Sequence, residues 1–155
     1  MPVTRPVLLA LLALPLSLAH FQAPAAQRQE ILDFVKAYAD ATNRGDMTAY
    51  VDMYSRRSDL IVVNDGEITR GIDAVRNEAN QTLGLEGSYK ISVGTIDVVP
   101  LGQTRAIAVF PFAMTVQSQQ GPVQIRAAMT LVLEKGSQGW RIIHDHTSSA
   151  PAQGE

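Results

Sequence analysis

The chain contains no cysteine among its 155 residues. Disulfide bonds, thiolate nucleophiles and zinc sites with cysteine ligands are therefore excluded. The chain also lacks a block of lysine or arginine residues, and its net charge at pH 7 is only −2. Because nucleic-acid affinity depends largely on clustered positive charge, we expect no nucleic-acid partner.

Long hydrophobic runs are scarce, and the one near the N-terminus is too short to span a bilayer comfortably. It covers residues 7–14, follows Arg5 and ends at Pro15. The small residues Ala-Pro-Ala at 23–25 fit a cleavage site, so the pattern predicts a signal peptide over residues 1–25. An uncleaved N-terminal anchor is the alternative. We expect no stable membrane span after cleavage, and a cysteine-free exported protein fits the bacterial periplasm or exterior.

After the predicted signal peptide, the first part of the chain has the apolar periodicity of helices. Apolar residues recur at helical spacing over residues 27–43, over 47–54 and in a third segment that opens at Gly71. Gly45 and Asp46 separate the first two helices. Glycine suits the left-handed position after a helix, and aspartate is a good N-cap.

Strands make up the rest of the expected domain. A hairpin is predicted from strands 59–64 and 67–70 around the turn Asp65-Gly66. Four longer strands are predicted over residues 89–99, 105–117, 123–134 and 138–147. Two helices, a hairpin and a third helix, followed by four long antiparallel strands, favour an α+β fold with the helices packed on one face of a curved sheet. We expect this domain over residues 26–148 and a flexible tail over 149–155.

The last predicted strand carries the most informative side chains. Strict alternation places one set of residues on a single face: Trp140, Ile142, His144, His146 and Ser148. It places Asp145 on the opposite face. A strand face that begins apolar and ends in two histidines and a serine predicts the wall of a pocket.

Three segments in this order and spacing resemble the nuclear-transport-factor-2-like superfamily. They are Asn43-Arg44-Gly45-Asp46, Arg70-Gly71-Ile72-Asp73-Ala74-Val75 and the strand from Trp140 to Ser148. The most similar subgroup is the small bacterial proteins described as SnoaL-like or ketosteroid-isomerase-like. The resemblance implies a cone-shaped fold whose helices and concave sheet face enclose one apolar pocket. It also implies homodimers formed through the outer face of the sheet.

The resemblance allows a residue-by-residue comparison with the ketosteroid isomerases. Their oxyanion-binding tyrosine matches Tyr38. The position of their proton-shuttling aspartate falls on Asn64, which cannot act as a base, and that of their protonated aspartate falls near Met129. Ketosteroid isomerisation is therefore not expected. His144 and His146 remain as candidate bases, because neutral histidine accepts protons near pH 7.

The sequence leaves three functions open. The first is the binding of a small hydrophobic molecule in the pocket; the second is a cofactor-free acid–base isomerase, cyclase or lyase; the third is a dimerisation module. The candidate catalytic residues are His144, His146 and Tyr38. The candidate ligand-binding residues are Tyr54, Asn64, Phe112, Met129, Trp140 and Ser148. Two histidines without a nearby carboxylate pair make a poor zinc site, so neither a metal nor a cofactor is expected.

Overall fold

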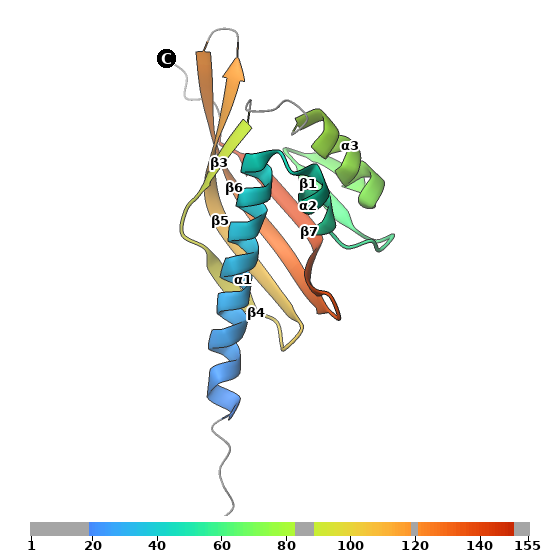
Figure 1. Ribbon diagram of the computed structural model, residues 1–155, viewed down its shortest axis with the longest axis vertical. Coiled ribbons are helices and arrows are strands. Elements are labelled where there is room, and N and C mark those ends of the chain that lie inside the picture. Colours follow the sequence, from blue (N-terminus) through green and yellow to red (C-terminus); the bar gives the residue numbers. More distant parts are fainter. Residues whose placement is uncertain (1–18, 83–88, 119–120, 151–155) are drawn as a thin grey trace, which may run out of the picture.

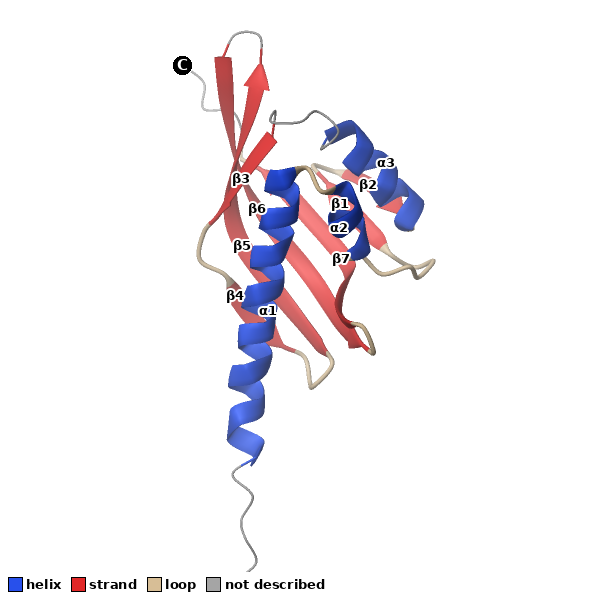
Figure 2. Ribbon diagram, viewed as in Figure 1, coloured by secondary structure: helices blue, strands red, loops and turns tan. Residues whose placement is uncertain are grey.

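The computed structural model describes residues 19–82, 89–118 and 121–150, which form helices on one face of a seven-stranded sheet (Figure 1). The elements are α1 (Ala19–Arg44), α2 (Met47–Asp52), β1 (Ile61–Asn64), β2 (Glu67–Arg70), α3 (Ile72–Thr82), β3 (Tyr89–Val93), β4 (Asp97–Pro100), β5 (Arg105–Ser118), β6 (Gly121–Gly136) and β7 (Gly139–Ser149). The long helix α1 crosses the sheet, and α2 and α3 lie over its β1–β2 side (Figure 2). The predicted α+β class is confirmed.

The sheet is mixed rather than wholly antiparallel, which corrects one expectation. Its strand order is β2-β1-β7-β6-β5-β3, with β4 also paired to β5, and β1 runs parallel to β7. The parallel pairing begins just before β1. The amide of Ser55 donates to the carbonyl of Ile142, and the amide of Ile142 donates to the carbonyl of Met53. The chain that leaves α2 therefore runs beside β7 in the same direction.

The strand predicted over residues 89–99 is interrupted and forms β3 and β4. Residues 94–96 lie opposite only two residues of β5, because Val93 pairs with Phe112 and Asp97 pairs with Val109. The amide of Gly94 donates to the carbonyl of Pro111 at 2.8 Å. A Cβ at Gly94 would lie 2.9 Å from the Pro111 ring, so this close approach requires glycine.

Two predicted turns are confirmed. Gly45 ends α1 with a φ of 66°, and the Asp46 carboxylate accepts a hydrogen bond from the amide of Ala49, which caps α2. Asp65 and Gly66 both have positive φ values, as a two-residue turn of type I′ requires. These turns are determined by short local sequences, so they could be predicted without knowledge of the fold.

The core lies between the helices and the inner face of the sheet. Its largest fully buried side chains come from both layers: Tyr54, Phe110, Ile31, Leu60, Leu131, Leu133, Ile142 and Val35. Helix α1 begins at Ala19, earlier than predicted and inside the segment expected to be a signal peptide. Residues 1–18 of that segment, and residues 151–155 of the expected tail, lie outside the described ranges. The domain boundaries therefore stay predictions.

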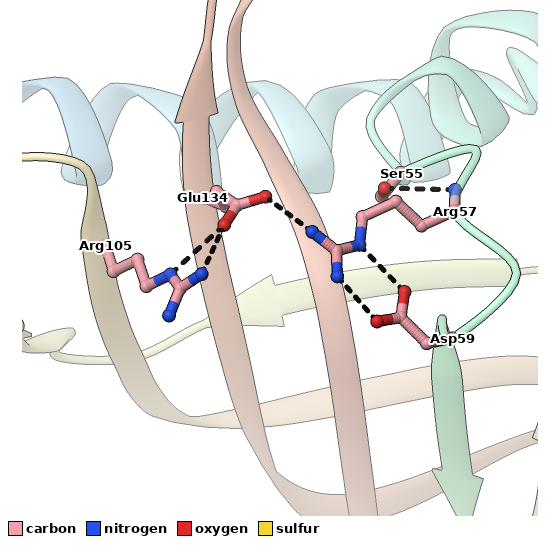
Figure 3. A network of polar contacts seen from close by, with 5 residues as sticks. All are labelled: Ser55, Arg57, Asp59, Arg105 and Glu134. Atoms are coloured by element: carbon pink, nitrogen blue, oxygen red, sulfur yellow. Dashed lines mark hydrogen bonds and ion pairs between the residues drawn. The ribbon is translucent and has the colours of Figure 1, made fainter.

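An exposed polar network holds the loop before β1 against the outer face of the sheet (Figure 3). Arg57 donates to both carboxylate oxygens of Asp59 and, at 3.4 Å, to Glu134 on β6. Arg105 on β5 donates to the same Glu134 carboxylate at 2.8 Å. Exposed ion pairs add little stability, so the role of this network is to position the loop that leads into β1.

Candidate functional site

A cavity of about 220 Å³ lies between the inner sheet face and the three helices. Its apolar wall comes from Val62, Val75, Ala79, Ile91, Phe112, Met114, Ile125 and Met129. Its polar groups come from Tyr38, Thr42, Tyr50, Tyr54, Asn64, Asp65, Glu78, Tyr89, Asp145, Thr147 and Ser149. Every helix and five of the strands supply at least one of these residues. The cavity is therefore built by the whole fold rather than by one motif.

A β-bulge in β7 decides which side chains reach the cavity. On β6, Leu133 pairs with Ile142 and Val132 pairs with His144, so Ile143 is an extra residue without a partner. One extra residue reverses the alternation beyond it. Ile142 faces inward before the bulge, and Asp145 faces inward after it. Asp145 is 4% exposed and lines the cavity.

The predicted orientation of His144 and His146 is wrong for this reason. Both histidines lie on the outer face of the sheet, where they pair with Val132 and Thr130 of β6, and neither lines the cavity. Ser148 also lies on the outer face. Strict alternation assigned these three residues to the pocket, and the bulge at Ile143 moves all of them out of it.

A chain of hydrogen bonds links three tyrosines to Asp145. The Tyr54 hydroxyl donates to Oδ2 of Asp145 at 2.6 Å. The hydroxyls of Tyr54 and Tyr50 are 3.0 Å apart, and those of Tyr50 and Tyr38 are 3.2 Å apart. Tyr50 lies in α2, and Tyr54 follows four residues later, just after the helix ends. Their rings pack with centroids separated by 5.3 Å. Helices α1 and α2 thus deliver a line of hydroxyls to one carboxyl group.

The Asp145 carboxyl group is the electrostatic centre of the cavity. Burial raises its pKa to about 7; the Tyr54 hydrogen bond lowers it, and the nearby Glu78 raises it further. Its Oδ1 atom is buried and has no hydrogen-bond partner within the described residues. Burial also raises the pKa of Tyr89 to about 12 and holds the pKa of Tyr50 well above its usual range. The tyrosines therefore stay protonated as donors while Asp145 can change its charge near neutral pH.

Two further carboxylates lie along the cavity wall, and each has a partner. Glu78 of α3 accepts a hydrogen bond from the Asn64 side chain at 2.8 Å. Asp65 accepts from the amide and the hydroxyl of Ser149, at 2.6 and 2.8 Å. These hydrogen bonds lower the pKa of Asp65, with a smaller contribution from His146. Asp145 is thus the one cavity carboxyl group of the described chain that combines deep burial with an unpartnered oxygen.

Five of the predicted site residues line the cavity: Tyr38, Tyr54, Asn64, Phe112 and Met129. Their roles stay predictions. Trp140 does not line it; its indole nitrogen donates to Glu30 of α1 at 2.8 Å. The sequence reasoning missed Asp145, Tyr50 and Glu78 as site residues. The adjacent pair Ile142-Ile143 was the available signal for Asp145, because two successive apolar residues interrupt a strict alternation.

No group of three or more metal-ligating side chains is present in the described ranges. Within the same ranges, no helix has the length and apolar character needed to cross a membrane.

Comparisons with known proteins point to one family. Residues 31–153 match the family model of the SnoaL-like domain. No curated protein sequence matches the chain. Many solved structures share the fold.

Three of these structures illustrate the likeness. An NTF2-like protein with a cystatin-like fold from Novosphingobium aromaticivorans is 16% identical, with a TM-score of 0.73; the match covers 90% of this chain and 94% of that one. An NTF2-like protein of unknown function from Shewanella oneidensis is 23% identical, with a TM-score of 0.66, and the match covers 79% and 98%. The association domain of CaMKII from C. elegans is 17% identical, with a TM-score of 0.68, and the match covers 80% and 96%.

Proposed function

We propose that the cavity of this chain, which belongs to the SnoaL-like domain family, binds a small and largely apolar molecule. The supporting observation is that Asp145, which lines the cavity, is buried and has an unpartnered Oδ1 atom. A buried polar atom without a partner costs about 1–3 kcal/mol. A purely structural core would use an apolar residue there, so the carboxyl group is best explained by a ligand that contacts it.

The cavity volume limits the ligand. Sites for drug-sized molecules typically measure about 300–1,000 Å³, whereas this cavity measures about 220 Å³. We expect a compound of about one ring, with its apolar part against Phe112 and Met129 and its polar part at Asp145.

A cofactor-free acid–base enzyme is the second candidate, with Asp145 in the role that the sequence assigned to a histidine. A general acid or base works best when its pKa is near the working pH, and the pKa of Asp145 is raised to about 7. Tyr54 would hold the carboxyl group in place, and Tyr38 would turn its hydroxyl from Tyr50 to donate to an oxyanion. An isomerase, cyclase or lyase reaction fits these groups.

We expect one-ring aldehydes, ketones and alcohols to bind, as measured by saturation-transfer NMR in D₂O. Thr147→Phe fills the cavity and should abolish binding, because Thr147 lines it. Ser148→Phe is the matched control, since Ser148 is the next residue and lies on the outer face. Loss of binding in both variants, or in neither, would argue against the cavity as the site.

The same spectra test the second candidate. Acid–base catalysis should exchange the hydrogens next to the ketone carbonyl for deuterium faster than buffer alone. Bound ketone that exchanges only at the buffer rate would remove the enzyme candidate and leave ligand binding intact.

We also propose that two copies of the chain associate through the outer sheet face. This face carries apolar side chains from five strands: Ile61, Ile68, Val99, Ile107, Val109 and Val132. Val99 and Ile68 are half-exposed or more, and Val109 is 37% exposed. Contiguous apolar surface of this kind is typical of interfaces. The likeness to an association domain supports a second copy of the chain as the partner.

The substitution Val109→Glu should convert the dimer to a monomer in sedimentation experiments, because it buries a charge in the interface. Val123→Glu is the control. Val123 is similarly exposed at 49%, but its position on β6 places it on the opposite face from Val109. A dimer that survives Val109→Glu would exclude this face as the contact.

A further inference from the structure

We propose that the ligand of this cavity is a small organic cation, a protonated amine carried on an apolar group. The proposal rests on the proposed binding function of the cavity and names the class of molecule that it binds. It follows from three observations: the charges of the wall, the aromatic rings in it, and the direction of the hydroxyl donors.

The described lining of the cavity is acidic and contains no basic residue. Three carboxyl groups line the cavity, those of Asp65, Glu78 and Asp145, and its described lining includes no lysine, arginine or histidine. Ion pairs elsewhere in the described chain involve none of the three. Asp145 is the deeply buried one of the three, and a buried carboxylate is normally paired with a positive group. The missing positive group is therefore best supplied by the ligand.

Aromatic residues are numerous in the wall of the same cavity. Tyr38, Tyr50, Tyr54, Tyr89 and Phe112 all line the cavity. The face of an aromatic ring attracts cations, and a desolvated cation gains more from it than an exposed one. A wall of aromatic rings and carboxylates suits an ammonium group better than a neutral or anionic group.

The chain of tyrosine hydroxyls is oriented so that it stabilises the charged form of Asp145. Tyr54 donates to Asp145, so its oxygen is left to accept from Tyr50, and the Tyr50 oxygen is left to accept from Tyr38. All three O–H bonds then point toward the carboxylate, and the Tyr38 oxygen is left as an acceptor. An ammonium group has donors and no acceptor, so it matches the free Oδ1 atom of Asp145 and finds no competing donor on the carboxylate side of the hydroxyl chain.

The proposal predicts a specific pH dependence. Five titratable side chains from the surrounding elements interact with Asp145. They are Tyr38 of α1, Tyr50 of α2, Tyr54 just after α2, Glu78 of α3 and Tyr89 of β3. The tyrosines stay neutral, so Asp145 sets the charge. Its proton must leave before a cation binds, and amine affinity should fall as the pH falls below about 7. A neutral ligand that accepts a proton from Asp145 would show the reverse.

Titration calorimetry with three probes of nearly equal shape tests the proposal. Benzylamine stays protonated at neutral pH, because alkyl amines have pKa values of about 10; benzyl alcohol is neutral and benzoate is an anion. Above pH 7, benzylamine should bind at least about tenfold more tightly than benzyl alcohol. Asp145→Asn should weaken benzylamine binding about 10- to 100-fold and weaken benzyl alcohol binding by a clearly smaller factor. Asp97→Asn, on an exposed strand, should change neither.

Two results would overturn the cation assignment and leave the cavity's binding function standing. One is that benzyl alcohol binds as tightly as benzylamine, and the other is that Asp145→Asn leaves benzylamine binding unchanged. Binding of none of the three probes would count against both. If the Asp145→Asn protein does not fold, Glu78→Gln provides a second test. Removing the like charge of Glu78 lowers the pKa of Asp145, so the pH at which amine binding is half of its maximum should move down. An unmoved midpoint would overturn the proposal.

Discussion

Asp145→Asn is expected to stabilise the fold at pH 8 by about 2–4 kcal/mol and to have almost no effect at pH 4. The pKa of Asp145 is about 7 in the folded chain, against a usual value of 3.8. A carboxyl group with a raised pKa in the folded state contributes stability that is complete below its unfolded pKa. That stability is lost as the pH rises through the folded pKa. The wild-type chain should therefore lose stability between about pH 4 and pH 7, and the asparagine variant should lose less.

Urea unfolding at four or five pH values checks this result. Asp97→Asn is the control, because it removes the same charge from an exposed strand and should leave the pH profile as in the wild type. An Asp145→Asn protein that is less stable than the wild type at pH 8 would show that the charged carboxyl group is better accommodated than its burial indicates. The expected gain also fits a functional role, because residues that serve a site are often retained at a cost in stability.

The parts of the fold that were predictable from the sequence depend on short local signals. Gly45-Asp46 and Asp65-Gly66 each define their turn through the conformations that glycine and aspartate allow. The helices follow from their apolar periodicity, and their order before the strands gave the class. Tyr38 was placed in the cavity by resemblance and not by periodicity, since a buried tyrosine on a helix is equally compatible with a plain core.

The missed features depend on contacts between distant segments. The bulge at Ile143 lies where β7 changes its neighbour, from the segment after α2 to strand β1. The break at Gly94 depends on its contact with Pro111. Neither partner can be identified from the strand alone. One extra residue was enough to exchange the predicted faces of His146 and Asp145, so the site was placed on the correct strand with the wrong side chains.

The second large effect is expected from Tyr54→Phe. The Tyr54 hydroxyl donates the single described hydrogen bond to Asp145, and its loss leaves both carboxyl oxygens without a partner. Hydrogen bonds to charged groups contribute about 1.5–3 kcal/mol, and those between neutral groups about 1 kcal/mol. We therefore expect a loss near the higher figure at pH 8, where Asp145 is charged, and near the lower figure at pH 5. Because this bond lowers the pKa of Asp145, the pKa should rise further in the variant.

A double-mutant cycle separates this interaction from general damage to the core. Tyr38→Phe is the matched control, because it removes a hydroxyl from the far end of the same chain, 3.2 Å from Tyr50. Its cost should be about 1 kcal/mol and nearly independent of pH. In the Asp145→Asn background, Tyr54→Phe should cost about 1 kcal/mol at every pH, which gives a coupling energy of about 1–2 kcal/mol at pH 8. A coupling energy near zero would mean that Tyr54 stabilises the core through its ring and not through the charge of Asp145. The carboxyl group of Asp145 would then lack the fixed orientation on which the proposed site depends.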